Sequence, residues 1–285
     1  MTIAEALRRG AAALRLAGIE DAELEAEVLL RHTLGLSRAH LFLRLQDELD
    51  PEDERLFHKL VERRRAHVPT AYLTGHREFY GLDLLVGPEV LIPRPETEHV
   101  VEEALRVGRA LLARQERGTL VDVGTGCGAI ALAVAKHLPA LRVLAVDCSP
   151  GALAIAGLNA KRLRLAGRVT FLQGDLLQPV YEPVDIVAAN LPYIPSDFIP
   201  TLQPEVRNYE PRQALDGGPD GLRVIARLLV QVPSYLRDGR GTVILEIGFG
   251  QAEPLRALVA ERLPGAALRF THDLAGIERV AVIQL

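Results

Sequence analysis

Residues 119–129 read TLVDVGTGCGA, an apolar run that ends in glycines at Gly124, Gly126 and Gly128. An apolar run followed at once by glycines predicts a strand, a tight turn and the start of a helix, because glycine permits both the turn and the close approach of a ligand to the backbone. We therefore predict a nucleotide-type cofactor at this turn. The same pattern also satisfies a loose dinucleotide fingerprint, so from this stretch a nicotinamide oxidoreductase remains an alternative.

Beyond this stretch, short apolar runs alternate with helical patterns, which is typical of a parallel sheet built from βαβ units. The predicted strands are 119–123, 142–147, 169–173, 184–189, 242–247, 268–272 and 279–284. The predicted helices are 96–115, 130–137, 151–165, 221–236 and 251–263. The sequence thus predicts a seven-stranded sheet with helices in the intervals.

The last two strands are separated by only about six residues around Gly276. Parallel neighbours need roughly a dozen or more connecting residues, so this pair must be an antiparallel hairpin. A mostly parallel seven-stranded sheet with an antiparallel last strand is typical of class I, Rossmann-like methyltransferases that use S-adenosylmethionine, whereas a dinucleotide-binding fold keeps its six strands parallel. The predicted fold class is therefore an α/β methyltransferase sheet.

The chain upstream of the sheet has a different pattern of apolar residues, glycines and prolines. From residue 1 to 68 the apolar spacing is helical, with Pro51 well placed at the first turn of a helix, so we predict a small all-α domain for packing or for docking a protein substrate. Residues 69–95 are punctuated by glycine and proline and predict a hairpin-bearing linker. The predicted methyltransferase domain spans residues 96–285.

Composition narrows the function classes. The chain has 285 residues and no apolar run near the roughly 18 to 20 residues of a membrane helix, and its N-terminus lacks a secretory pattern, so we expect a cytoplasmic protein without a membrane partner. A net charge of -4 gives no global attraction to nucleic acid. Cys127 and Cys148 lack the spacing of a metal site, so we expect no metal.

Acidic residues accompany the predicted strand ends. Asp147 ends the second strand about 20 residues after the glycines, where a carboxylate can accept both ribose hydroxyls of a cofactor. Asp175 follows the third strand, and it either contacts the adenine or caps the next turn. Asp122 either accepts from the ammonium of a bound methionine moiety or orders the glycine loop, and these readings stay open. Cys127 is interpreted as a small residue in a crowded turn.

Asn190-Leu191-Pro192-Tyr193 follows the fourth strand, at the sheet edge where α/β proteins bind ligands. A planar nitrogen such as a carboxamide is a poor nucleophile, because its lone pair is delocalised. Asn190 Oδ1 and the Leu191 carbonyl can accept its two N–H bonds, Pro192 restricts the backbone of residue 191, and Tyr193 can cover the π-face. The motif therefore predicts methylation of a planar nitrogen, without a general base before transfer.

The chain resembles the protein-(glutamine-N5) methyltransferases, and within them the release-factor branch. The resemblance spans most of the chain and is carried by motifs more specific than the glycine loop, namely Tyr72–Gly75, Phe79–Leu82, Leu91–Glu98, Asn190–Ile194, Glu210–Gly218 and Glu246–Gly248. It implies methylation of the glutamine in the Gly-Gly-Gln motif of class I peptide-chain release factors, with S-adenosyl-L-homocysteine as the second product and the N-terminal domain gripping the factor.

Site residues follow from the motifs and the resemblance together. The expected cofactor residues are Asp122, Gly124, Thr125, Gly126, Cys127, Gly128, Asp147, Asp175, Leu176 and Asn190. The expected catalytic and acceptor residues are Asn190, Leu191, Pro192 and Tyr193, while Arg94 and Glu96 are expected to help close the site.

One departure concerns the acceptor. The family has two prolines where this chain has Leu191-Pro192, and Asn-Leu-Pro-Tyr also resembles RNA adenine-N6 methyltransferases, so methylation of RNA or of a ribosomal-protein glutamine stays an alternative. An RNA enzyme would need a dense basic face, whereas the longest basic run, 63–65, lies among acids. An oxidoreductase would need a hydride-transfer partner, and the sequence offers none that we can identify. The segment 92–98 favours the release-factor branch.

Overall fold

The computed structural model describes residues 1–115, 117–273 and 275–285. These residues form two units, one of Met1–His76 with Gln203–Tyr209 and one of Arg77–Leu202 with Glu210–Leu285. The predicted helical segment 1–68 lies within the first unit. The predicted linker 69–95 divides between the two, since its first residues form a short helix that the sequence analysis did not anticipate and its later residues form the expected hairpin.

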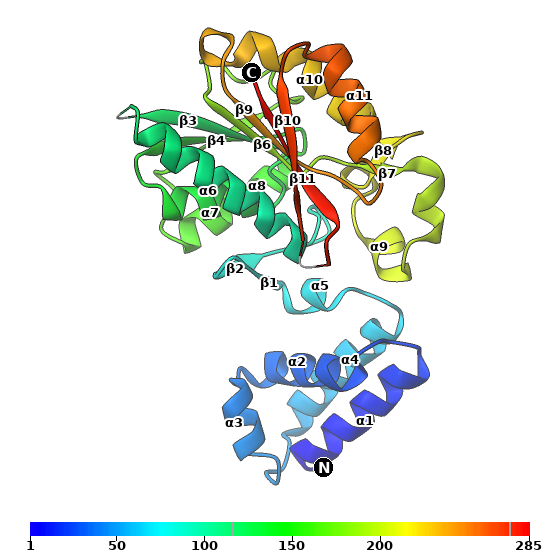
Figure 1. Ribbon diagram of the computed structural model, residues 1–285. Helices are drawn as coiled ribbons and strands as arrows, with labels where there is room; N and C mark the ends of the chain where they lie inside the picture. Colours follow the sequence, from blue (N-terminus) through cyan, green and yellow to red (C-terminus); the bar gives the residue numbers. More distant parts are fainter. Residues whose placement is uncertain (116, 274) are drawn as a thin grey trace. The chain divides into compact units, whose positions relative to one another are not determined.

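The first unit is all helical (Figure 1). Its helices are α1 (Ile3–Leu16), α2 (Ala22–Leu34), α3 (Arg38–Leu43), α4 (Pro51–Arg65), α5 (Thr70–Thr74) and α9 (Pro204–Tyr209). Thr2 and Glu5 form a reciprocal capping box at the start of α1. Pro51 occupies the first turn of α4, as predicted, and Asp50 accepts from the Glu52 amide there.

Helix α9 comes from far along the chain but belongs to this unit. Arg64, which is 5% exposed, pairs with Glu25 at 3.0 Å and with Glu205 of α9 at 2.6 Å. The Tyr209 hydroxyl donates to the Ala66 carbonyl at 2.7 Å. The N-terminal helices are therefore completed by a segment that follows the acceptor motif in sequence.

The second unit is built on a seven-stranded sheet of order β10-β11-β9-β6-β3-β4-β5. Its strands are β3 (Gly118–Val123), β4 (Leu141–Asp147), β5 (Val169–Gln173), β6 (Ile186–Ala189), β9 (Thr242–Glu246), β10 (Ala267–His272) and β11 (Glu278–Gln284). The last strand, β11, is antiparallel to both of its neighbours, β10 and β9, whereas β3, β4, β5, β6 and β9 pair in parallel. The predicted fold class is confirmed.

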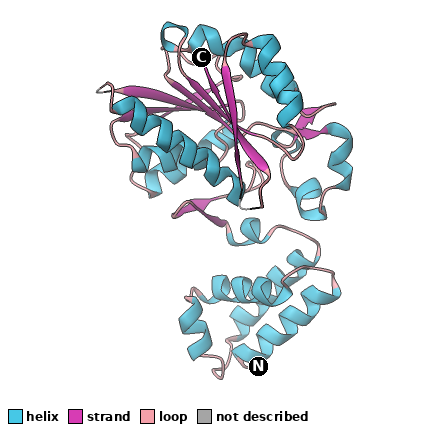
Figure 2. Ribbon diagram, in the orientation of Figure 1, coloured by secondary structure: helices cyan, strands magenta, loops and turns pink. Residues whose placement is uncertain are grey.

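Helices cover both faces of this sheet, as Figure 2 shows. They are α6 (Glu98–Leu112) after the 3-10 turn η1 (Pro95–Thr97), α7 (Ala129–His137), α8 (Pro150–Arg162), α10 (Arg223–Tyr235) and α11 (Ala252–Arg262). Helices α6 and α7 pack together on one side, and α10 packs with α11 on the other. Alternate residues of the central strands, such as Val121 and Val187, share one apolar core with Leu228 and Leu255 of α10 and α11, which follows from the period of two along a strand.

The strand order reverses between β3 and β6. From β3 the chain continues outward through β4 and β5, then returns to place β6 on the opposite side of β3, with Val123 paired to Ala189. Ligands of open α/β sheets bind at such a switch point, beyond the carboxyl ends of the strands. The two predicted motifs leave the sheet from these adjacent strand ends.

Some boundaries differ from the prediction for identifiable reasons. Strand β6 begins at Ile186 rather than at residue 184, because Asp185 turns its carboxylate to the Thr119 amide at 2.8 Å while Val184 forms only an isolated bridge. Helix α10 begins at Arg223 rather than at Gly221, whose φ of 76° is not helical. The sequence analysis also did not predict the short strands β7 (Ile194–Pro195) and β8 (Asp216–Gly218), whereas the small sheet of β1 (His76–Phe79) and β2 (Leu82–Leu85) is the expected hairpin.

Two further features concern the described part of the chain. Every helix there is too short or too polar to cross a bilayer. No three His, Cys, Asp or Glu side chains gather there as the ligands of a metal ion would.

Candidate active site

The loop between β3 and α7 carries the three predicted glycines. Each has a positive φ, 75° at Gly124, 56° at Gly126 and 88° at Gly128. Residues other than glycine rarely adopt this backbone conformation. The amides of Gly124 and Thr125 donate to the Val146 carbonyl at 2.8 and 2.9 Å, which anchors the loop on β4. All of these residues except Gly128 line a cavity at the carboxyl edge of the sheet.

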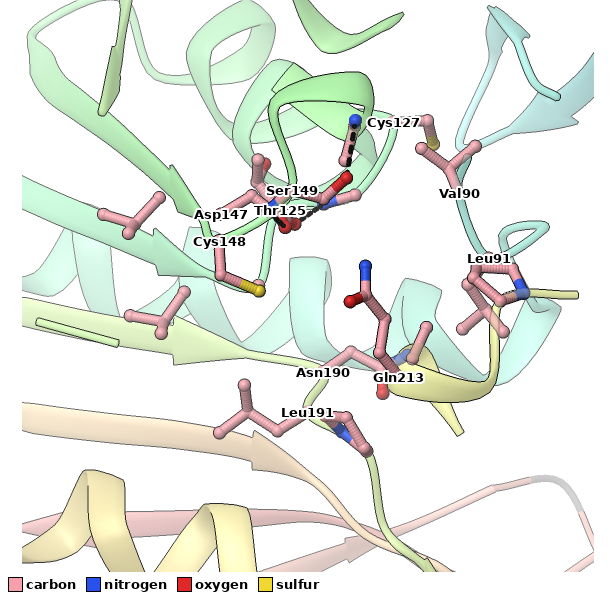
Figure 3. A pocket seen from close by; sticks show the side chains of 18 of the residues that line it. Val90, Leu91, Thr125, Cys127, Asp147, Cys148, Ser149, Asn190, Leu191 and Gln213 are labelled. Carbon is pink, nitrogen blue, oxygen red and sulfur yellow. Dashed lines mark hydrogen bonds between the residues drawn. The ribbon is translucent and has the colours of Figure 1, made fainter. Parts of the chain in front are cut away.

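Asp147 joins the glycine loop to the next helix. Its Oδ2 accepts from the Gly126 amide and its Oδ1 from the Ser149 amide, both at 2.9 Å. Ser149 caps α8 by accepting a hydrogen bond from the Ala152 amide. Figure 3 shows Asp147, Cys148 and Ser149 on one side of the cavity and Asn190 and Leu191 on another. The carboxylate is thus held in the wall; its contact with ribose hydroxyls stays a prediction.

Asp122 lies beneath the glycine loop and is fully buried. Its Oδ2 accepts from the Thr125 hydroxyl at 2.6 Å and from the Ala131 amide at 3.1 Å, so it ties the loop to the first turn of α7. Burial raises the pKa of this carboxyl to about 7, although both hydrogen bonds oppose the shift. Among the described residues Asp122 is not part of the cavity wall, so this geometry favours loop ordering over contact with a methionine ammonium.

Cys127 packs in the same turn and is 2% exposed. Burial raises the pKa of its thiol to about 12, and its carbonyl accepts from Asn159 Nδ2 at 2.9 Å. A thiol held in this way is a poor nucleophile, because it stays protonated. The geometry agrees with the interpretation of Cys127 as a small residue in a crowded turn.

Asp175 and Leu176 follow β5 and both line the cavity. Asp175 forms an ion pair with Arg227 of α10. Leu176 adopts a φ of 53° and is buried in the cavity wall. These two residues thus lie where the sequence analysis expected contacts to a cofactor.

The acceptor motif leaves β6 beside the glycine loop. Asn190, Leu191 and Pro192 line the same cavity, and Asn190 Nδ2 donates to the Thr97 hydroxyl at 3.0 Å. The Leu191 side chain is buried, with its Cδ2 3.1 Å from the point where a Cβ on Gly124 would lie. Leucine at this position therefore packs the acceptor motif directly on the cofactor loop.

Tyr193 is half-buried behind the motif and is not among the described residues that line the cavity. Its hydroxyl donates to Glu246 Oε1 at 3.1 Å, and burial, aided by the Glu246 charge, raises the pKa of the phenol above its ordinary value. The Tyr193 carbonyl accepts from Gln251 Nε2 at 2.8 Å. The predicted stacking of its ring on an acceptor amide stays a prediction.

Glycines from distant motifs support the backbone of the acceptor motif. A Cβ on Gly217 would lie 2.7 Å from the Pro192 carbonyl oxygen, and one on Gly221 would lie 2.2 Å from the Tyr193 carbonyl oxygen. A Cβ on Gly248 would approach the Tyr193 ring to 3.1 Å. Two of the motifs that carried the resemblance, 210–218 and 246–248, therefore contact residues 190–193. A side chain at Gly217, Gly221 or Gly248 would collide with this segment, which explains the glycines there.

Arg94 and Glu96 occupy a segment at the cavity margin without being part of the described wall, which instead includes their neighbours Leu91, Pro93 and Thr97. Arg94 forms an ion pair with Glu210, whose other oxygen accepts from the Ile92 amide at 3.3 Å. This pairing joins the segment 91–97 to the segment 211–214, which also lines the cavity. A role for Arg94 in closing the site stays a prediction.

Several residues at the site had no role assigned from sequence. Thr97, Glu210 and Glu246 lie in the motifs that carried the resemblance, while Gln213 lines the cavity and Gln251 holds the acceptor backbone. The position of Glu246 in the sequence could have identified it. It is an acid at the end of a buried strand, and burying a carboxylate costs free energy, so an acid at such a position indicates a functional role.

Two protein-family models match parts of this chain. Residues 5–75 match a family described as the PrmC N-terminal domain, and residues 105–197 match the methyltransferase small domain. The chain is 47% identical over 282 residues to the release factor glutamine methyltransferase of Moorella thermoacetica, covering 98% of this chain and 97% of that protein. It is 37% identical over 281 residues to the Bacillus subtilis protein of the same name, covering 98% and 96%.

A solved structure extends the comparison to the fold. The catalytic domain of hMettl16, crystallised in complex with the MAT2A 3'UTR hairpin 1, matches with a TM-score of 0.58 and 16% identity over 79% of this chain and 80% of that one. At this identity the similarity shows the shared fold alone.

Proposed function

The chain belongs to the release factor glutamine methyltransferase family, and we propose that it methylates the side-chain amide nitrogen, N5, of the glutamine in the Gly-Gly-Gln motif of class I peptide-chain release factors. The observation that supports this proposal is the proximity of the Leu191 side chain to Gly124, because it places the predicted amide-binding motif beside the predicted cofactor loop in one cavity. A methyl donor and a planar acceptor can meet there.

The residues of the cavity fit S-adenosylmethionine. Asp147 and Asp175 offer carboxylates for its hydroxyl and amino groups, Val123, Val146 and Leu176 offer apolar walls, and the glycine loop permits close approach of the backbone. When bound, this cofactor supplies an electrophilic methyl group on a sulfonium and leaves as S-adenosyl-L-homocysteine. The proposed cofactor residues are those expected from sequence, with Asp122 acting from beneath the loop.

Asn190 and Leu191 would orient the acceptor amide. Because Asn190 Nδ2 is bonded to Thr97, its Oδ1 is left to accept one N–H of the incoming glutamine, and the Leu191 carbonyl accepts the other. Two such bonds fix the plane of the amide and oppose the delocalisation of its lone pair. Pro192 restricts the backbone of residue 191, which keeps that carbonyl in place.

The chemistry requires orientation rather than a base before transfer. Orientation of two reactants can supply several kcal/mol, and the attacking nitrogen loses its extra proton after the methyl group is transferred. Tyr193 is not suited to remove a proton early, since its pKa is raised and its hydroxyl is bonded to Glu246. No described residue of the cavity wall is histidine or lysine.

The partner is a protein, and we propose that the helical unit docks it. The match of residues 5–75 to the PrmC N-terminal domain supports this proposal. Because release factors act in translation, we also propose that the reaction takes place in the cytoplasm. No described feature of the site indicates that the reaction requires a membrane or a nucleic acid.

The proposal is tested by incubating the chain with methyl-labelled cofactor and three acceptors. These are a class I release factor, the same factor with the loop glutamine changed to alanine, and ribosomal RNA. We expect label in the unaltered factor alone. Label in both factors would contradict the choice of glutamine, and label in RNA alone would contradict a protein acceptor.

A further inference from the structure

A side chain from the loop after β9 holds the backbone of the acceptor motif. Gln251 directly precedes α11 and is 8% exposed. Its Nε2 donates to the Tyr193 carbonyl at 2.8 Å, and its Oε1 accepts from the Gly248 amide at 2.8 Å. Both ends of this buried amide are therefore used, and they join the loop after β9 to a residue 58 positions earlier in the chain.

We propose that Gln251 is a positioning residue for methyl transfer, which fixes the backbone of the acceptor motif so that the Leu191 carbonyl faces the acceptor amide. This inference rests on the proposed function. Gln251 lies outside the motifs that carried the resemblance, and neither they nor the comparisons assign it a role.

The Leu191 carbonyl needs support from elsewhere in the chain. The peptide that joins Leu191 to Pro192 has no N–H, because proline lacks one, so hydrogen bonds can hold this peptide only through its carbonyl. In the proposed function that carbonyl accepts from the incoming glutamine. Its direction must therefore be set by packing and by the residues that flank it.

The peptide between Tyr193 and Ile194 supplies this support. Its carbonyl accepts from Gln251, and its amide, that of Ile194, donates to the Leu215 carbonyl at 3.0 Å. Both polar atoms of this peptide are thus held by other segments. Because the proline ring fixes φ of Pro192, few torsions remain between the two peptides, and a rotation at Tyr193 would be passed on to the Leu191 carbonyl.

Two glycines pack their backbone directly against this contact. A Cβ on Gly221 would lie 2.5 Å from Gln251 Nε2 and 2.2 Å from the Tyr193 carbonyl oxygen. A Cβ on Gly248 would lie 3.1 Å from Gln251 Oε1. This close packing leaves little room for water to replace the bond, so a Tyr193 carbonyl that loses Gln251 loses its partner outright.

The groups on either side require a carboxamide between them. The Gly248 amide can only donate and the Tyr193 carbonyl can only accept, so the side chain between them must offer one acceptor and one donor. These fixed partners also decide which end of the Gln251 amide faces the acceptor motif. A carboxylate of the same shape would accept from Gly248 but would place a second acceptor against the Tyr193 carbonyl.

The experiment compares two substitutions in the full chain with release factor as acceptor. Gln251→Glu keeps the shape and the contact with Gly248 but removes the donor, whereas Gln251→Met removes both polar contacts. Gln284→Glu is the matched control, because Gln284 is exposed and pairs with Thr242 at the start of β9, away from the cavity. The measurements are kcat, the KM for release factor, and the Kd for S-adenosylhomocysteine by titration calorimetry.

We expect kcat to fall on the order of tenfold to a hundredfold in both Gln251 variants at about pH 8, as for a misplaced group near the chemistry. The KM for release factor and the Kd for S-adenosylhomocysteine should change by less than about threefold, because the binding surfaces for both remain in place. Gln284→Glu should keep all three values within about twofold of the wild type.

The pH dependence of kcat separates a lost donor from a general disturbance of packing. Burial raises the pKa of a carboxyl group, and a protonated carboxyl has an O–H that can donate to the Tyr193 carbonyl. We therefore expect the kcat of Gln251→Glu, relative to that of Gln251→Met, to rise severalfold as the pH falls from about 8 to about 6. Both variants share the charged groups around this contact, so the titration of those groups cancels in the ratio. These groups are Glu246 of β9, Arg279 of β11, Glu253 of α11, Asp220 beside Gly221, and Arg94.

Each other result contradicts a definite statement. A wild-type chain that does not methylate release factor contradicts the proposed function, whatever the variants do. If the wild type is active, an unchanged kcat in either Gln251 variant, or a loss that appears in KM instead, contradicts the positioning role alone. Loss of folding or of S-adenosylhomocysteine binding in both Gln251 variants, or a kcat ratio that does not change with pH, also contradicts it, because Gln251 would then only support the packing of its loop.

Discussion

The backbone amide of Gly126 donates a 2.9 Å hydrogen bond to the carboxylate of Asp147, so the turn after β3 and the acid that ends β4 form one continuous part of the cavity wall. The Ser149 amide occupies the other carboxylate oxygen. The position of Asp147 is therefore determined by backbone amides of the glycine loop and of the segment before α8, rather than by the cofactor itself.

Asp147→Asn should weaken cofactor binding. The amide cannot accept from Gly126, Ser149 and the ribose hydroxyls as a carboxylate does, and a hydrogen bond to a charged group contributes roughly 1.5–3 kcal/mol, so the Kd for S-adenosylhomocysteine should increase about tenfold to a hundredfold. Calorimetric titration measures this. Asp83→Asn is the control, because the Asp83 side chain is 60% exposed in a surface pair with Arg162; equal Kd values for both variants would contradict the assignment of Asp147.

Asn190→Ala should abolish detectable methyl transfer while the Kd for S-adenosylhomocysteine stays within about tenfold. The side chain supplies one of the two proposed acceptors for the glutamine amide, whereas Asp147 and the glycine loop remain in place. Single-turnover transfer of labelled methyl to release factor is the measurement. Turnover near that of the wild type would remove Asn190 from the proposed acceptor site.

Asp122→Asn should change how stability depends on pH. The folded-state pKa of Asp122 is raised to about 7, above its unfolded value of about 4, so the folded chain binds more protons between these values and loses stability as the pH rises through that window. Asparagine does not titrate and can still accept from Thr125 and Ala131. The Tm of the variant minus that of the wild type should therefore increase from pH 5 to pH 8, as thermal melts would show; a constant difference would mean that the pKa is not raised.

Arg64→Ala should destabilise the helical unit by about 2 kcal/mol, because it removes the positive charge that pairs with the partly buried carboxylates of Glu25 and Glu205. Arg65 is a matched control, since it is the next residue and its pair with Glu62 is exposed, so Arg65→Ala should cost less than about 1 kcal/mol. Urea unfolding followed by circular dichroism compares the two. Equal losses would show that the Arg64 pairs contribute nothing beyond a surface ion pair.

The sequence was informative about those parts of the structure that a local pattern of residues determines. The glycine loop, the alternation of strands and helices along the chain and the final antiparallel hairpin depend on spacing within a few residues, and the structure confirms the fold that they predict. The same holds for Pro51, which lies in the first turn of a helix as its residue type predicts.

The sequence was less informative where residues meet only in space. Nothing near Thr97 in the sequence indicates that it contacts Asn190, 93 positions away. The two readings of Asp122 involve the same residue in the same strand, and only its buried contacts with Thr125 and Ala131 favour one of them. Helix α9 was missed because it has six residues and no buried residue to mark a pattern.

Helix α9 also has a consequence for how the chain is made. The first unit is incomplete until Tyr209 has been synthesised, although its other residues end at His76, more than 130 positions earlier. At about 5–20 residues per second, between about 7 and about 27 seconds separate these two events on the ribosome. During that interval Arg64 has no Glu205 to pair with, so the nascent N-terminal helices must wait for most of the catalytic unit before their own packing can be finished.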